Sequence, residues 1–410
     1  MPLDLTMLGQ QVRRMSTAMA ARVDATSERT AQVAARFVQE TGNEAHWREA
    51  VSLSRKTASW LFAQPHEPLD TVCDVPPLPT DYALAATDGS QIERDRHGPA
   101  DCYLINTGRV YLRYGEQPRA RLTSEPNLYY RDEDMYIIKG AQRTAIEGNY
   151  LSVRRDIDEL LALTVLVDEF LIDDNATLPV LALQDGTLIR WALAGADTFV
   201  QDYFLRKYLE GLAHLRQRGI PVASYISRPR ATELLGTVRL MFCPDVNVSD
   251  QRGARCSECS DVKAGREPSC SICNDLVDAD VLAQRLQEGQ RGPLCVSMSR
   301  INIEAYNNWH GGDHLIYFFY MRVGRELARI EMPRWVALNA ALVDRVHALI
   351  YDQCVRGQGY PVALARAHEQ AIVRSADRRT FQRIVEGSLL RAELPATSSR
   401  KQEKKERTAL

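Results

Sequence analysis

Two stretches of the sequence decide the fold, LAATDGS at residues 84–90 and LALQDGT at residues 181–187. Each is a short apolar run that ends in Asp-Gly, as a buried β-strand does where it leaves a sheet. In α/β sheets, ligands bind beside the carboxyl ends of central strands. We therefore expect Asp88 and Asp185 to lie side by side at one edge of a sheet. A single Asp-Gly is more often only a turn, so this expectation depends on the two occurring together.

Helices and further strands surround these two stretches. An amphipathic pattern predicts a helix between about residues 134 and 173. Residues 102–116 predict two β segments that meet at Thr107-Gly108, and residues 221–229 predict another strand. Three strands followed by alternating helices and strands give a mixed sheet with helices on its faces, which is an α/β core.

Composition and charge restrict the class of protein. The chain has 410 residues, of which 45% are hydrophobic, and 51 Lys and Arg against 53 Asp and Glu. These values exclude a disordered chain, a collagen and a coiled-coil rod, and they exclude a uniformly basic surface for nucleic acid. The sequence lacks a signal-peptide pattern and any apolar run of about 18 residues. We therefore expect a cytoplasmic protein that does not enter a membrane.

The chain is predicted to divide into four parts. Residues 1–64 form an N-terminal helical arm, and residues 80–390 form the α/β domain. A polar four-cysteine module is inserted at residues 250–275, and residues 391–410 are a charged tail predicted to be disordered. The arm carries one apolar stripe, which either packs in a dimer, docks on a partner or folds back on the core. The stripe consists of Leu5, Leu8, Val12, Met15 and Met19.

Paired carboxylates indicate a metal site. Two converging aspartates repel each other unless a cation lies between them, and Mg²⁺ and Mn²⁺ prefer oxygen ligands. A two-metal site for phosphoryl transfer usually takes a third carboxylate from a packed helix. We favour Glu159 for this position, because it lies one turn after Arg155 and beside the apolar stripe of its helix. Asp156 and Asp158 remain alternatives, since periodicity does not decide among the three.

Four further side chains are candidates for the site. His368 lies on a late helix whose apolar residues face inward, where a histidine is more often a hydrogen-bonded core or surface group than a ligand. Tyr225 ends a predicted strand and could position a phosphate or a water molecule. Arg228 and Arg230 follow it and could bind a DNA backbone, or they could be ordinary surface cations.

Four cysteines predict a structural zinc site. They have the spacing C-x2-C-x10-C-x2-C, which gives two thiolate pairs that can close around one tetrahedral Zn²⁺. An iron–sulfur cluster also accepts four thiolates and is the alternative, while four unliganded thiols are the third choice. We expect no catalytic role for such a site, because four thiolates leave no open coordination position. The four are Cys256, Cys259, Cys270 and Cys273.

Six motifs in this order resemble the NurA nuclease family. They span about residues 80 to 385 and are ATDGSQ, RxxxE, LQDGTL, SYISRP, LARIEMPRWVA and GYPVALARAHEQA. The resemblance implies an RNase H-like core, Mn²⁺- or Mg²⁺-dependent nuclease activity on DNA, a homodimer, and partnership with a HerA-like hexameric ATPase. It also implies five site residues, namely Asp88, Glu159, Asp185, Tyr225 and His368. The long segment before Glu159 and the four-cysteine insertion depart from the smallest members of the family.

The predicted function is a metal-dependent deoxyribonuclease that acts in DNA end processing, as a 5′-to-3′ exonuclease, a single-strand endonuclease or both. The sequence has no nucleotide-binding motif, so ATP use must come from a partner. The alternative is a non-catalytic DNA-binding adaptor that recruits a translocase to DNA ends. Such an adaptor would keep the fold but would not need the paired aspartates.

Overall fold

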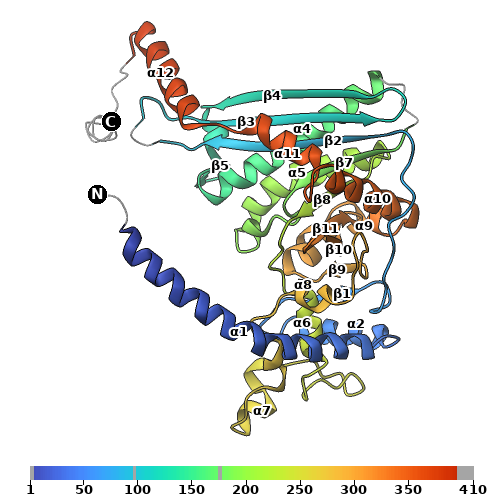
Figure 1. Cartoon of the computed structure of the whole chain (residues 1–410). Coiled ribbons are helices and arrows are strands. Elements are labelled where there is room, and N and C mark those ends of the chain that lie inside the picture. The colour runs from blue at the N-terminus through green and yellow to red at the C-terminus, as the bar shows by residue number, and fades with distance from the viewer. Residues whose placement is uncertain (1–3, 96–97, 174–177, 395–410) are drawn as a thin grey trace. The chain divides into compact units, whose positions relative to one another are not determined.

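The computed structural model describes residues 4–95, 98–173 and 178–394 (Figure 1). The chain forms two compact units, each built from segments that are distant in sequence. Unit 1 comprises Met1–Val75, Ser227–Ile303 and Tyr317–Ile330. Unit 2 comprises Pro76–Ile226, Glu304–Ile316 and Glu331–Leu410. Each unit is described by itself below.

Unit 2 contains a five-stranded part of the sheet in the order β8-β7-β2-β3-β4. The first three strands in sequence pair antiparallel, whereas β7 pairs parallel with both β2 and β8. All residues of β7 except its last are buried, as its continuous apolar sequence predicts. The strands are β2 (Tyr82–Ile92), β3 (Tyr103–Tyr114), β4 (Arg119–Tyr129), β7 (Val180–Asp185) and β8 (Val222–Ile226). The predicted α/β fold with an RNase H-like mixed sheet is confirmed.

Helices cover both faces of this sheet. Successive residues of a strand point to opposite faces. Gly89 of β2 faces helix α4 (Asn149–Asp173), because a Cβ atom there would lie 2.6 Å from the Glu159 carboxylate of that helix. Asp88 and its cross-strand partner Gly108 face helix α11 (Val362–Ala371), where a Cβ atom on Gly108 would lie 2.2 Å from the Ala367 carbonyl oxygen. Helices α4 and α11 therefore lie on opposite faces of β2 and β3.

The other elements of unit 2 are helices and a small hairpin. A predicted helix start near residue 134 is wrong, because a short helix and the hairpin β5–β6 occupy residues 132–145. The long helices are α4 (Asn149–Asp173), α5 (Thr198–Gln217), α10 (Ala340–Arg356), α11 (Val362–Ala371) and α12 (Ser375–Arg391). The short elements are α3 (Asp132–Met135), β5 (Tyr136–Lys139), β6 (Gln142–Ala145) and α9 (Arg334–Ala337).

Unit 1 has its own apolar core around the N-terminal helices. The predicted helices of the arm are present, and only the second half of α1 is buried in that core, through residues such as Val33 and Phe37. The helices are α1 (Leu5–Gln39), α2 (Glu44–Ser54), α6 (Glu233–Leu240), α7 (Ser260–Lys263) and α8 (Asp278–Ala283). The strands, in the order β1-β9-β10-β11, are β1 (Ala63–Pro65), β9 (Cys295–Ser297), β10 (Ile316–Val323) and β11 (Glu326–Pro333), of which β10 and β11 reach a few residues into unit 2.

Two predicted strand ends are wrong. Asp88-Gly89 and Thr107-Gly108 lie in the middle of β2 and β3 and pair with each other across the ladder. Their glycines do not make turns. They lack a side chain at positions where a helix approaches the sheet closely, as the contacts that a Cβ atom would make at Gly89 and Gly108 show. Only the third pair, Asp185-Gly186, ends a strand, and Gly186 there has a φ of +76° that favours glycine.

The insertion and the tail are described in part. The regular structure of residues 250–275 consists of an isolated β-bridge from Arg252 to Asn247 and of short helical turns at Cys256–Glu258, Ser260–Lys263 and Ser269–Cys273. Of the predicted charged tail, residues 395–410 lie outside the described part of the chain. Within the described residues, no helix is both long enough and apolar enough to span a membrane.

A Gly108→Ala substitution is expected to lower the free energy of unfolding by about 1–3 kcal/mol. The new methyl group would collide with the backbone of α11, at the Ala367 oxygen and the Ala371 nitrogen, and backbone atoms cannot move aside cheaply. Urea unfolding measures the change. Gly195→Ala is the control, because nothing lies within 4 Å of a Cβ atom at that position. Equal stability of the two variants would contradict the close approach of α11 to β3.

Candidate functional site

Asp88 and Asp185 lie next to each other at the open end of the β2–β7 ladder. The last paired residues of the two parallel strands are Thr87 and Gln184, and the aspartates come directly after them. Each Asp carboxylate accepts a hydrogen bond from the backbone N–H of the glycine that follows it, at 2.9 Å and 3.0 Å. Burial raises the pKa of Asp185, and the nearby Asp88 carboxylate raises it further. The structure thus brings together the two residues that the sequence paired.

Glu159 joins this pair from α4. The Thr87 hydroxyl donates to the Glu159 backbone carbonyl at 2.9 Å and fixes this turn of α4 against β2. The Glu159 carboxylate accepts from Arg155 Nε at 3.1 Å. Burial, then repulsion by Asp156 and Asp88, raises the pKa of Glu159 well above that of an ordinary carboxyl. Glu159 is thus a third carboxylate close to the first two, and it is the buried one.

The other two helix carboxylates are placed differently. Asp158 faces another part of unit 2, where it accepts from Tyr129 Oη at 2.7 Å and from Arg154 Nε at 3.0 Å. Asp156 lies in the same row as Glu159 and accepts from Arg155 and from Arg190. Of the three alternatives on the helix, the geometry therefore favours Glu159, with Asp156 as its neighbour.

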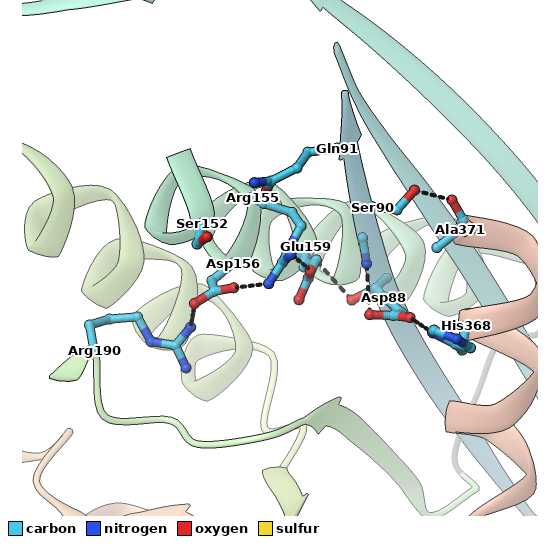
Figure 2. A network of polar contacts seen from close by, with 12 residues as sticks. Asp88, Ser90, Gln91, Ser152, Arg155, Asp156, Glu159, Arg190, His368 and Ala371 are labelled. Carbon is cyan, nitrogen blue, oxygen red and sulfur yellow. Dashed lines mark hydrogen bonds and ion pairs between the residues drawn. The ribbon is translucent and has the colours of Figure 1, made fainter. Parts of the chain in front are cut away.

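An arginine that the sequence did not single out completes this row. Arg190 is buried, 6% exposed, with its guanidinium 4.7 Å from the centre of the Tyr208 ring. Arg190 lies beyond the end of β7, where no periodic pattern marks it. Figure 2 shows that the side chains form a continuous polar row, which runs through Arg190, Asp156, Arg155 and Glu159.

Gly89 allows this row to approach β2. A Cβ atom on Gly89 would lie 2.6 Å from Glu159 Oε1 and 2.7 Å from Arg155 Cγ. Any side chain at this position would push both groups away from the strand. The glycine of the first Asp-Gly motif is thus required by the close packing of α4, and not by a turn.

His368 reaches Asp88 from the other face of the sheet. Its Nδ1 atom lies 2.6 Å from Asp88 Oδ2 (Figure 2). The end of α11 is held there by its Ala371 carbonyl, which accepts from the Ser90 hydroxyl and, at 2.8 Å, from Asn106 Nδ2. The His368 side chain is 66% exposed, so most of its ring is accessible to a substrate.

Tyr360 is a second site residue that sequence reasoning missed. Its hydroxyl donates a hydrogen bond to Asp185, and burial together with that carboxylate raises the pKa of Tyr360. The predicted Tyr225 lies behind it, fully buried, with ring centres 5.4 Å apart at 90°. Tyr225 therefore supports Tyr360, which contacts the carboxylate itself. The GYP sequence before the His368 helix was the feature that could have identified Tyr360, but it does not show which carboxylate this tyrosine contacts.

The donor set matches what a hard divalent cation binds, namely carboxylate oxygens with one imidazole. Across residues 4–95, 98–173 and 178–394, no three His, Cys, Asp or Glu side chains are arranged as a closed metal site. Each carboxylate instead has a protein partner: Arg155 for Glu159, His368 for Asp88 and Tyr360 for Asp185. Even with these partners, desolvation first and the neighbouring carboxylates second raise the pKa values of Glu159 and Asp185.

The two predicted DNA-binding arginines belong to unit 1, whereas the carboxylates belong to unit 2. Arg228 has a left-handed backbone with φ of +45°, and its Nε lies 3.3 Å from Glu326 Oε2. Arg230 is also exposed. Within unit 1, both are surface cations.

The four predicted zinc ligands lie in one part of unit 1 but differ in burial. Cys273 is fully buried in the apolar core, whereas Cys256, Cys259 and Cys270 are partly exposed. Burial raises the pKa of Cys270, and the neighbouring thiols of Cys256 and Cys259 contribute to the rise. A fifth thiol, Cys243, was not included in the predicted set. Burial raises its pKa to about 11, with contributions from Cys259 and Cys270.

The fold and the site together define a class. A mixed sheet of three antiparallel and two parallel strands, with carboxylates clustered where the two central parallel strands stop pairing, is the arrangement of an RNase H-like nuclease. The family model described as the NurA domain matches residues 82–373. The chain therefore belongs to the NurA family of nucleases, and the matched segment contains all five site residues that the resemblance implied.

None of the curated proteins matches the chain. A solved structure of LC9-RNase H1, a type 1 RNase H with the type 2 active-site motif, is similar at 14% sequence identity and a TM-score of 0.19. The similarity covers 39% of this chain and 70% of that one.

Proposed function

We propose that this nuclease cleaves DNA with Mn²⁺ or Mg²⁺, as a 5′-to-3′ exonuclease, a single-strand endonuclease or both, in DNA end processing. The observation that carries the proposal is the convergence of Asp88, Glu159 and Asp185 with His368 at the open end of two parallel strands. These four residues would hold the metal. When bound, such a metal activates water and neutralises charge at the scissile phosphate.

The protein's own residues prepare this site in specific ways. Tyr360 orients the Asp185 carboxylate, and His368 orients that of Asp88. Arg155 compensates charge beside Glu159 and is close enough to contact a phosphate that enters the site.

A non-catalytic adaptor is the alternative, and the electrostatics of the site oppose it. Burying carboxylates together disfavours their charged forms, as the raised pKa values of Glu159 and Asp185 indicate. A protein that only binds DNA gains nothing from this arrangement, since negative charge also repels the phosphate backbone. A catalytic site explains why the cluster is present.

Asp88→Asn and Asp185→Asn should each lower the rate of Mn²⁺-dependent cleavage by about two orders of magnitude or more, because each removes a negatively charged metal ligand. Glu159→Gln should have a similar effect. Single- and double-stranded DNA labelled at either the 5′ or the 3′ end reports both rate and polarity. Asp158→Asn is the matched control on the same helix and should cleave like the wild type. Wild-type rates in either aspartate variant would refute the assignment.

As the pH falls, cleavage should be lost at a higher pH than it would be if the carboxyl groups of the site had ordinary pKa values. The metal binds the deprotonated carboxylates, and raised pKa values of Glu159 and Asp185 mean that protonation begins earlier as the pH falls. Raising the Mn²⁺ concentration should shift the acid limb of the pH–rate profile to lower pH, because metal and protons compete. An acid limb independent of Mn²⁺ would argue against these residues as ligands.

We also propose one structural Zn²⁺ in unit 1, with an iron–sulfur cluster as the alternative. Elemental analysis of the full chain should find about one zinc per protein, and Cys256→Ser or Cys259→Ser should lose it. Cys73→Ser, outside the group, should retain it. Because Cys243 lies near the group and Cys273 lies in the core, serine variants of these two identify the fourth ligand. A freshly purified protein without metal would exclude the site, and iron with a visible absorption band would favour the cluster.

We further propose a homodimer that works with a HerA-like ATPase hexamer, in the cytoplasm as the sequence predicts. The first half of α1 supports a docking role, since its apolar stripe stays exposed, with Leu5 73%, Met15 54% and Met19 58% accessible. Separating duplex DNA costs about 1.4 kcal/mol per base-pair step, and a motor would supply that energy.

Deletion of residues 1–20 tests the docking role, because the buried contacts of α1 begin later, near Val33. We expect single-strand cleavage to be retained while binding to the hexamer, and ATP-dependent degradation of long duplexes, are lost. Size-exclusion chromatography and a co-purification assay measure assembly. Equal duplex degradation by the full-length protein with and without the motor would contradict the partnership.

A further inference from the structure

A pocket lies beside the carboxylate cluster in unit 2 and has no role in the function proposed above. Its volume is about 290 Å³, at the small end of the range for small-ligand pockets. It opens between the loop that follows β2 and helix α12. Residues that line it include Ile92, Arg94, Cys102, Arg378, Phe381 and Val385.

The position of the pocket follows from the strand that carries Asp88. Arg378 Nη2 donates to the backbone carbonyl of Gln91 at 3.2 Å, and Gln91 lies three residues beyond Asp88 on β2. At about 3.3 Å per strand residue, this is about 10 Å from the aspartate. A stacked DNA strand rises about 3.4 Å per nucleotide, so the distance corresponds to about three nucleotides.

The chemistry of the pocket suits one nucleotide. Phe381 and Val385 present a half-buried apolar wall to Ile92. An aromatic ring in such a wall can stack on any base. Arg94 is already engaged by Asp101 and by the Tyr136 hydroxyl. Arg378 is exposed and, among the described residues, has no carboxylate partner, so its guanidinium can bind a phosphate.

We propose that this pocket binds one unpaired nucleotide of the DNA strand, about three positions from the bond that the carboxylate cluster cleaves, with the base stacked on Phe381 and its phosphate bound by Arg378. A base in a duplex would have to unpair before it could enter. The pocket thus selects single-stranded DNA. The position of the cleaved bond rests on the proposed nuclease function, whereas binding itself does not.

The test measures binding of the full-length protein to a fluorescent single-stranded 12-mer without divalent metal, by anisotropy. Phe381→Ala and Arg378→Ala should each weaken binding by about 5- to 100-fold, the range for one base stack or one charged contact. Arg379→Ala is the matched control, since this neighbouring arginine is exposed but does not line the pocket. It should bind within about threefold of the wild type at physiological salt. No residue of α12 is buried, so thermal unfolding should be unchanged in all three.

A scan of abasic nucleotides separates base recognition from phosphate recognition. Removing the base at the pocket position should weaken wild-type binding and should cancel the effect of Phe381→Ala, while Arg378→Ala still weakens binding further. Equal affinity of Phe381→Ala and wild type for the intact strand would overturn the proposal. Loss of affinity in Arg379→Ala as large as in Arg378→Ala would also overturn it, because it would show only a general charge effect.

Cleavage of the same strand with Mn²⁺ distinguishes this proposal from the nuclease function. If the wild type binds through the pocket but does not cleave, the nuclease function fails and the pocket stands. If the wild type cleaves and the pocket variants bind and cleave equally well, the pocket fails and the nuclease function stands.

Discussion

Repulsion among clustered carboxylates is the constraint on which unit 2 depends. Asp88, Glu159 and Asp185 come from two strands and a helix. Desolvation and the neighbouring carboxylates raise the pKa of Glu159, which is buried, and that of Asp185 at the end of β7. Held without partners, such groups would either take up protons or move apart. The surrounding structure prevents this with one partner for each, namely Arg155, His368 and the hydroxyl of Tyr360. Each carboxylate of the cluster is therefore held in place by a partner from the protein itself.

The sheet meets this constraint through two glycines. Gly89 lets α4 bring Glu159 against one face of β2, and Gly108 lets α11 bring His368 against the other. Because β7 ends at Asp185, β2 has no neighbour on that side beyond Thr87. Side chains from both faces of the sheet, Glu159 and His368, can therefore meet at the part of β2 that β7 does not cover. This geometry gathers the carboxylates at the end of the short strand β7 beside the longer strand β2.

The core of unit 1 supports helix α1 and the four-cysteine insertion. Its core packs the second half of α1 and reaches as far as Cys273 of the insertion, while the first half of α1 stays exposed. An insertion as polar as residues 250–275 cannot order itself by burial. Its short helical turns instead rest on the core of unit 1, through Arg239, which donates to the Cys273 carbonyl at 3.1 Å.

The sequence by itself determined the α/β class, the N-terminal helices, the buried strand β7 and the pairing of Asp88 with Asp185. These follow from local patterns, since apolar runs and their spacing report which residues are buried. The sequence also narrowed the third carboxylate to three neighbours on one helix, but could not choose among them. Each of the three lies close to both apolar and polar positions. The periodicity therefore predicted the helix but did not predict which of these carboxylates it turns toward the sheet.

Only the tertiary structure decided how distant residues meet. It placed Glu159 toward Asp88 and turned Asp158 toward Tyr129, because the rotation of α4 is set by its contact with Gly89. It also showed that two of the three Asp-Gly and Thr-Gly pairs are not turns, since a glycine that avoids a collision looks the same in sequence as one that bends the chain. Arg190 and Tyr360 entered the site for the same reason. Their partners are fixed by packing across the fold, which no local pattern records.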